Sequence, residues 1–182
     1  MPSLLGSPPP ALKFRSATAH DAAEIARLYV EGWQQLLADH RQRVPPGGAR
    51  PDSHERRWRS DLLNGGSRVG AILALSADQP VGLCAWRPVL NPDGAAELLG
   101  FHLQKTHRGR HEGRRLLDAS FTVMRAMGYS TAVVWMWASA PEVRGYLERH
   151  GFRVDGERHA TELGQPMHEI RFRRALLDGL QV

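Results

Sequence analysis

Short stretches in which apolar and polar residues alternate, or in which apolar and β-branched residues dominate, recur along the chain and predict β-strands. The expected strands are Leu12–Ala17, Val69–Ser76, Val81–Trp86, Glu97–Leu103, Thr131–Trp137, Phe152–His159 and His168–Arg174. The segment A-D-Q-P after the second strand is typical of a hairpin loop, and N-P-D-G-A at Asn91–Ala95 predicts another turn. We expect the final two strands to form an antiparallel pair.

Apolar residues at helical spacing, bounded by capping and breaking residues, predict four helices. They are expected from Thr18–Asp21 to Ala38, from Asp52 or Ser53 to about Leu63, from Gly113 to about Met127, and from Pro141 to Gly151. The order βααβββαβαββ predicts an α+β fold (α and β mixed) around a mostly antiparallel sheet of six to seven strands with about four helices. The third helix is expected to provide the one parallel crossover.

The chain of 182 residues fits one globular domain, and its 42% hydrophobic content is sufficient for a substantial core. Residues 1–10, which include P-P-P, predict a flexible leader, residues 11–176 the folded domain, and residues 177–182 a tail. No stretch approaches the about 18 consecutive apolar residues that cross a bilayer. The N-terminus lacks the basic start and long apolar run of a signal peptide. We therefore expect a cytoplasmic protein without membrane association.

Basic residues exceed acidic ones, giving a formal net charge of +5, and all but two of the 24 basic residues are arginine. This charge predicts an anionic partner, whether nucleic acid, a phosphate-bearing cofactor or an acidic substrate. The one cysteine, Cys84, lies in an apolar run, where we expect a buried side chain rather than a nucleophile. His107 and His111 are four residues apart but do not lie together on the expected helix, so no metal is expected.

The segment T-H-R-G-R-H-E-G-R-R-L-L, residues 106–117, joins an expected strand to an expected helix. The first N–H groups of a helix have no internal partners, and the helix dipole favours negative charge there. Gly109 and Gly113 permit close approach of a ligand to the backbone. Four arginines add positive charge: Arg108, Arg110, Arg114 and Arg115. Because G-x-G-x-x-G and the Walker A pattern are both lacking, the segment alone predicts either a pyrophosphate site or a helix start that is merely basic.

The chain resembles the GNAT superfamily of acyl-CoA-dependent N-acyltransferases in the order of its elements and in three segments. These segments are this loop, E-L-L-G-F-H-L before it, and Y-L-E-R-H-G-F-R-V-D-G-E-R downstream. The resemblance covers about residues 12–174, and L-Y-V-E-G-W at Leu28–Trp33 is similar to the first helix of many members. The loop pattern of the family is Q/R-x-x-G-x-G/A. It places Arg108 first, His111 at the middle glycine and Gly113 last, so two of the three marked positions match.

The resemblance implies a sheet that is splayed between Glu97–Leu103 and Thr131–Trp137 to admit a thioester. It also implies acetyl-CoA as co-substrate, no metal, and transfer of an acetyl group to a primary amine by direct attack in a ternary complex. The residues implied to bind the cofactor are Phe101, His102, Leu103, Arg108, Gly109, Arg110, His111, Glu112, Gly113 and Arg114. Glu97 is implied as the base; the alternative is an exposed carboxylate at the end of the strand. The aromatic residues that either line the acceptor pocket or simply pack are Tyr29, Trp33, Trp58 and Trp86.

The side that some strand residues face is left open. His102 faces the splayed region unless a β-bulge, which is common there in the family, reverses its side. Trp135 and Trp137 alternate in an apolar strand and are expected in the core.

The chain departs from the family at the short helix. Ala140 replaces a frequent Asn, and the frequent Tyr of that helix falls on Leu147, with Tyr146 one position earlier. Tyr146 is therefore assigned either as the catalytic acid or as a core residue. These departures leave a catalytically silent acyl-CoA-binding sensor or interaction domain as the alternative function. Nucleic acid is not the expected partner, because no recognition motif is present. The expected acceptor is the amine of a small molecule or a peptide, and the expected oligomeric state is a monomer or a homodimer.

Overall fold

The structure is a computed structural model that describes residues 11–39, 51–64, 68–89, 94–162 and 165–176. In chain order its elements are β1 (Lys13–Ser16), the 3₁₀ turn η1 (Ala19–Asp21), α1 (Ala22–Asp39), α2 (Pro51–Leu63), β2 (Gly70–Ser76), β3 (Gln79–Pro88), β4 (Ala95–Leu103), the 3₁₀ turn η2 (Lys105–His107), α3 (Glu112–Ala126), β5 (Thr131–Trp137), α4 (Pro141–Arg149), β6 (Arg153–Glu162) and β7 (Gln165–Ala175). Helices and strands follow the order that the sequence predicts. The expected leader and tail, and most of the turn at Asn91–Ala95, lie outside the described residues.

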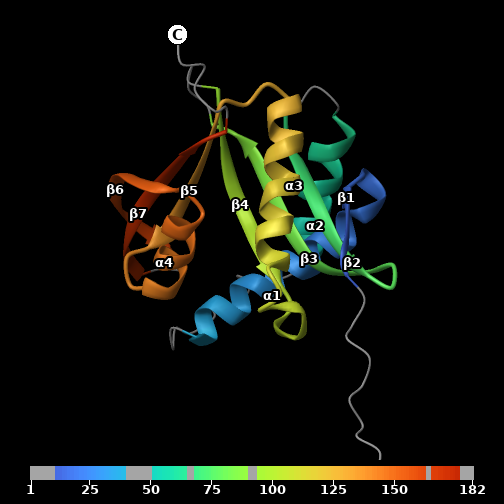
Figure 1. The fold of residues 1–182 in the computed structure, drawn as a ribbon, viewed down its shortest axis with the longest axis horizontal. Coiled ribbons are helices and arrows are strands. Elements are labelled where there is room, and N and C mark those ends of the chain that lie inside the picture. The colour runs from blue at the N-terminus through green and yellow to red at the C-terminus, as the bar shows by residue number, and fades with distance from the viewer. Residues whose placement is uncertain (1–10, 40–50, 65–67, 90–93, 163–164, 177–182) are drawn as a thin grey trace, which may run out of the picture.

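The strands form one seven-stranded sheet in the order β1-β2-β3-β4-β5-β7-β6. All neighbouring pairs are antiparallel except β4 and β5, which are parallel and connected through α3 (Figure 1). One face packs against α3 through residues such as Leu117 and Phe121. The other face packs against α1 and α2, through Ile25, Leu28 and Trp58. The expected α+β fold with one parallel crossover is confirmed.

β4 and β5 pair over only part of their length. Their register is Ala95 with Thr131, Ala96 with Ala132 and Glu97 with Val133, and no pairing follows. β5 nevertheless pairs with β7 along its whole length, and β4 pairs with β3 as far as Leu103. We call this region, residues 98–103 of β4 opposite residues 134–137 of β5, the strand separation. Groups from both faces of the sheet can meet there, because no ladder of hydrogen bonds closes it.

A β-bulge in β4 decides which side chains face each side of the strand separation. The register with β3 runs from Trp86 opposite Leu98 to Ala85 opposite Gly100, so Leu99 is the extra residue. An extra residue reverses the alternation of side chains beyond it. Phe101 consequently packs on the α3 side, against Tyr146 of α4, whereas His102 faces α1.

Residues with left-handed backbone close the turns. Gly128 (φ 82°) follows α3 and Gly151 (φ 79°) follows α4, which confirms both expected helix stops. The hairpin between β2 and β3 is tighter than the expected A-D-Q-P loop, since only Ala77 (φ 46°) and Asp78 (φ 64°) form it. Positive φ at both central residues produces a two-residue turn that matches the twist of the strands, so β3 already begins at Gln79.

Candidate functional site

The loop between β4 and α3 ends in a helix start with open backbone donors. His111 precedes α3 in the left-handed conformation, with φ 60° and ψ 6°, and no side chain caps the helix. The first N–H groups of α3 therefore have no partner within the helix, and they lie at the positive end of its dipole. Gly109 (φ 85°) is open to the surface, because a Cβ built there would meet nothing within 4 Å. This geometry can accept an anion.

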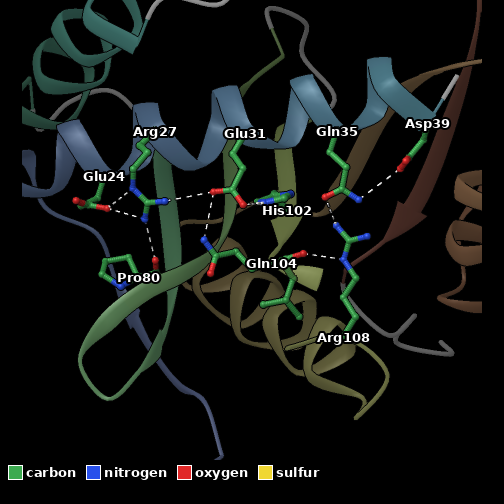
Figure 2. Close-up of polar contacts among 10 residues, drawn as sticks. Glu24, Arg27, Glu31, Gln35, Asp39, Pro80, His102, Gln104 and Arg108 are labelled. Carbon is green, nitrogen blue, oxygen red and sulfur yellow. Dashed lines mark hydrogen bonds and ion pairs between the residues drawn. The ribbon is translucent and has the colours of Figure 1, made fainter. Parts of the chain in front are cut away.

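Arg108 holds this loop to the end of β4 and to α1 (Figure 2). Its Nε donates to the carbonyl oxygen of Leu103 at 2.7 Å, and a terminal nitrogen donates to Oε1 of Gln35 at 2.9 Å. Leu103 lies beyond the paired part of β4 and β5, so Arg108 satisfies a carbonyl group at the strand separation. Arg110 and Arg114 are exposed near the same helix start, where they add positive charge.

A chain of polar contacts along α1 reaches the same end of the sheet (Figure 2). Arg27 donates to the carboxylates of Glu24 and Glu31, at 2.8 and 3.2 Å. It also donates to the carbonyl oxygen of Pro80 at 2.9 Å. The Glu31 carboxylate accepts from Nε2 of Gln104 at 3.2 Å. α1 is thereby fixed to β3 and to the residue that follows β4.

His102 lies beneath α1, and the bulge at Leu99 selects this orientation from the two that the sequence allowed. Its Nε2 is 3.3 Å from a carboxylate oxygen of Glu31, close enough for attraction but not aligned as a hydrogen bond. Burial lowers the pKa of His102 more than the neighbouring Glu31 raises it, and Arg108 and Arg27 lower it further. The ring is therefore neutral at pH 7.

Tyr146 extends from α4 toward β4 and the start of α3. Its ring stacks on Phe101, with centroids 5.6 Å apart, and on His150, at 4.1 Å. Its buried hydroxyl has no hydrogen-bond partner among the described residues and lies against Gly113. Burial raises the pKa of Tyr146 well above its usual value, so the phenol stays protonated. Leu147, in contrast, is a core residue.

A pocket of about 230 Å³ lies on the sheet face that α1 and α2 cover. Its lining residues are Tyr29, Trp33, His54, Arg57, Trp58, Asp61, Arg87, Glu97, Leu98, Leu99, Trp135, Arg158 and Glu169. Glu97, the last residue of β4 that pairs with β5, places its carboxylate here. Arg87 donates to Oε2 of Glu97 from Nε at 2.9 Å and from a terminal nitrogen at 2.8 Å. The two residues are direct cross-strand partners in β3 and β4, which fixes the direction of the carboxylate.

A second arginine–glutamate pair lines the same pocket. Nε of Arg158 donates to Oε2 of Glu169 at 2.6 Å, and Glu169 is only 3% exposed. These residues are also cross-strand partners, in β6 and β7. The Arg158 guanidinium lies 4.1 Å above the ring of Trp135. Neither Arg87 nor Arg158 is recognisable as a site residue from the sequence, because each becomes one only through its partner in the strand register.

Several expected site residues direct their side chains elsewhere. Trp86 is fully buried in the core beneath α3, because the alternation of side chains along β3 turns it away from the pocket. It is therefore a packing residue and does not line the pocket. Leu103 is a core residue, and Glu112 turns to Arg115, at 2.8 Å, so each offers a ligand only its backbone. Trp135, expected in the core, instead lines the pocket. Tyr29, Trp33 and Trp58 do line it.

A mixed seven-stranded sheet that separates between β4 and β5, with an uncapped helix start after β4, is the α+β fold of the GNAT-type acyltransferases. A family model described as "Acetyltransferase (GNAT) family" matches residues 24–152. The chain therefore belongs to the GNAT acetyltransferase family. A search of curated proteins finds no match.

Solved structures share this fold at low sequence identity. YncA from Salmonella typhimurium, solved with its cofactor acetyl-CoA, has a TM-score of 0.69 at 16% identity, covering 94% of this chain and 97% of that one. Ribosomal-protein-alanine N-acetyltransferase from Brucella melitensis has a TM-score of 0.70 at 18% identity, covering 90% and 99%. PaiA N-acetyltransferase from Thermoplasma acidophilum, in complex with coenzyme A, has a TM-score of 0.64 at 15% identity, covering 91% and 99%.

Two further observations concern the described residues only. None of their helices combines the length and apolar character that crossing a membrane requires. Nowhere in this part of the chain do three His, Cys, Asp or Glu side chains come together as they would to hold a metal ion.

Proposed function

We propose that this protein is an N-acetyltransferase that transfers an acetyl group from acetyl-CoA to a primary amine by direct attack in a ternary complex. The observation that carries the proposal is the placement of two half-sites on opposite faces of the strand separation. The open start of α3 and Tyr146 lie on one face, and the pocket with Glu97 lies on the other. A donor held on one face and an amine held on the other would meet between the strands.

The donor half-site fits the phosphates of coenzyme A. The backbone N–H groups of residues 112–114 would bind the pyrophosphate, with Arg108, Arg110 and Arg114 supplying positive charge. The carbonyl of Leu103 is already bonded to Arg108, so the pantetheine arm would pair with other backbone groups of β4 at the strand separation, such as those of Phe101. When bound, acetyl-CoA supplies an activated acetyl thioester. YncA and PaiA, which share the fold, bind acetyl-CoA and coenzyme A, respectively.

Glu97 is the proposed base. Arg87 occupies Oε2 with two N–H groups, while Oε1 has no donor among the described residues. Oε1 can therefore accept a proton from the attacking ammonium or amine, directly or through one water molecule. The rigid cross-strand pair keeps this oxygen directed into the pocket. Neutralising the amine in this way makes its lone pair available for attack.

Tyr146 is the proposed acid. Its hydroxyl is protonated, buried and without a partner, so it can donate to the departing sulfur at the strand separation. Cys84 is not suited to form an acyl-enzyme: it is fully buried, and burial raises the pKa of its thiol to about 12. A thiol of that kind is not ionised at neutral pH, which favours direct transfer over a covalent intermediate.

One observation favours the alternative, a catalytically silent acyl-CoA-binding domain. The Tyr146 ring stacks between Phe101 and His150, with its hydroxyl against Gly113, so the region near the donor half-site is already filled. In a sensor this packing could hold the ligand-free conformation. In an enzyme the Tyr146 ring must move before the thioester binds.

Calorimetric titration with acetyl-CoA, followed by thiol release in the presence of an amine panel, separates these functions. We expect binding below millimolar concentration and amine-dependent release of coenzyme A. Binding without turnover on any amine would favour the silent domain. No binding at all would reject both.

A further inference from the structure

The charges that line the pocket are balanced, and this bears on the acceptor. Each lining carboxylate has an arginine partner: Glu97 has Arg87 at 2.8 Å, Glu169 has Arg158 at 2.6 Å, and Asp61 has Arg57 at 3.7 Å. A polycationic acceptor needs carboxylates to bind each of its ammonium groups beyond the one that reacts. The pocket has none in excess, so it disfavours polyamines and similar polycations.

Arg158 retains hydrogen-bonding capacity that its ion pair does not use. Only Nε donates, to Glu169, and its terminal nitrogens have no acceptor among the described residues. The buried Glu169 and the Trp135 ring fix the plane of the guanidinium. A fixed guanidinium edge with free N–H groups matches the two oxygens of a carboxylate, which is the bidentate geometry that arginine prefers.

The remaining wall of the pocket is aromatic and the volume is small. Tyr29, Trp33 and Trp58 come from α1 and α2, and Trp135 comes from β5. The volume, about 230 Å³, lies below the range of about 300–1,000 Å³ typical of drug-sized ligands. Such a pocket fits a compact molecule with an apolar body better than a large oligosaccharide or a folded protein segment.

We infer that the acceptor is a small zwitterion, a free α-amino acid with an apolar or aromatic side chain, whose carboxylate is bound by Arg158 while its amine lies at Glu97. The inference rests on the proposed function and specifies its acceptor class. Arg158 acts as a specificity-determining residue: it binds the acceptor without taking part in the bond changes. The ammonium gives one proton to Glu97, the neutral nitrogen forms the new bond to the acetyl carbon, and the carbon–sulfur bond breaks. The thiolate takes a proton from Tyr146, and the second proton lost by the nitrogen returns to the Tyr146 oxygen through water.

The test compares amino acids with the amines that lack only the carboxylate. The pairs are L-phenylalanine with phenethylamine, L-leucine with isoamylamine, and L-methionine with 3-(methylthio)propylamine, alongside spermidine and a tetrapeptide that begins with phenylalanine. We expect kcat/KM to be at least about tenfold higher for at least one amino acid than for its paired amine, since a charge-assisted bidentate contact is a strong one. Spermidine and the tetrapeptide should be poorer acceptors than that amino acid.

Variants of Arg158 connect this preference to the proposed contact. Arg158→Gln should reduce the ratio of kcat/KM between amino acid and paired amine about tenfold. Arg158→Gln leaves Glu169 buried without a cation, which can destabilise the protein. Arg158→Lys is therefore a second variant, which keeps the positive charge but loses the bidentate geometry. The matched control is Arg59→Gln, which removes an exposed pair with Glu55 (2.7 Å) outside the pocket lining and should leave the ratio unchanged.

The outcomes separate the inference from the function. Three outcomes would each overturn the inference while leaving the proposed function intact. They are equal kcat/KM for amino acids and their paired amines, a higher kcat/KM for spermidine or the tetrapeptide, and a folded Arg158→Lys protein in which the ratio of kcat/KM between amino acid and paired amine is unchanged. If acetyl-CoA binds and no amine is acetylated, the proposed function fails and the acceptor class fails with it.

Discussion

The hydroxyl of Tyr146 lies so close to Gly113 that a Cβ built on the glycine would stand 2.9 Å from it. Gly113 belongs to the first turn of α3 and Tyr146 to α4, so this contact joins the two helices beside the strand separation. The absence of a side chain at Gly113 therefore leaves room for the phenol beside the helix start.

Substitution of Gly113 by alanine tests this relationship. Alanine is the better helix former, by about 1 kcal/mol, but crowding of the buried Tyr146 hydroxyl costs about 1–3 kcal/mol, so the melting temperature should stay the same or fall slightly. The added Cβ should displace Tyr146 and weaken acetyl-CoA binding about tenfold in calorimetric titration. Gly145→Ala is the matched control, because its Cβ would meet only the flexible end of Arg149, at 3.3 Å. Equal losses in the two variants would show that the Tyr146 contact has no special role.

Tyr146→Phe removes the hydroxyl and keeps the ring. Since the buried hydroxyl has no partner among the described residues, the free energy of unfolding should stay the same or rise slightly. If the phenol is the acid, kcat should fall at least about tenfold, with little change in the KM for acetyl-CoA. An unchanged kcat would leave Tyr146 as a packing residue.

His111→Gly tests the cost of a left-handed residue in the loop. His111 has φ 60°, a conformation that costs a residue with a Cβ roughly 1 kcal/mol and glycine nothing. Because this conformation is already present without a ligand, the relief stabilises the folded protein and should leave the acetyl-CoA affinity unchanged. The melting temperature should be retained, since the relief offsets the entropic cost of the new glycine. His107→Gly, in the neighbouring 3₁₀ turn, lacks this relief and should lower the melting temperature. Weaker binding by the His111→Gly protein would instead indicate that the imidazole contacts a phosphate.

Glu97→Gln keeps the shape of the side chain and its contact with Arg87 but removes the proton acceptor. We expect kcat to fall about 100-fold, while acetyl-CoA affinity is retained. Glu55→Gln, which alters an exposed ion pair of α2, provides the control. A Glu97→Gln enzyme with normal kcat between pH 6 and 9 would exclude Glu97 as the base.

The stability of the protein should depend on pH through His102. Burial lowers its pKa in the folded state, so below about pH 6.5 the unfolded chain takes up a proton that the folded chain does not. The free energy of unfolding should therefore decrease as pH falls from 7 to 5, with a slope from this group of at most about 1.4 kcal/mol per pH unit. His102→Gln should flatten that slope in urea titrations. The exposed His20→Gln should not, and equal slopes in all three proteins would contradict the assignment.

Local sequence signals determined the helices and strands and their order. These signals are the glycines after α3 and α4, the hydrophobic spacing of the helices and the β-branched run of β5. Each acts within a few residues, so it can be recognised without knowledge of the fold. The loop before α3 was identified for the same reason. Its arginines and glycines are contiguous, and a helix start is a local structure. The fold class followed from element order together with the resemblance to a family.

Tertiary structure decided which of these residues share a site. The bulge at Leu99 reverses the alternation in β4, and this single extra residue turns His102 toward α1 and Phe101 toward Tyr146. The pairs Arg87–Glu97 and Arg158–Glu169 exist only because each arginine lies opposite its glutamate in the strand register. An extra residue such as Leu99 moves every later side chain of the strand to the other face, and the alternation of the sequence does not show where such a bulge falls. The sequence therefore determined the elements and the helix start beside β4, whereas the pocket was decided by long-range strand pairing, which no local signal encodes.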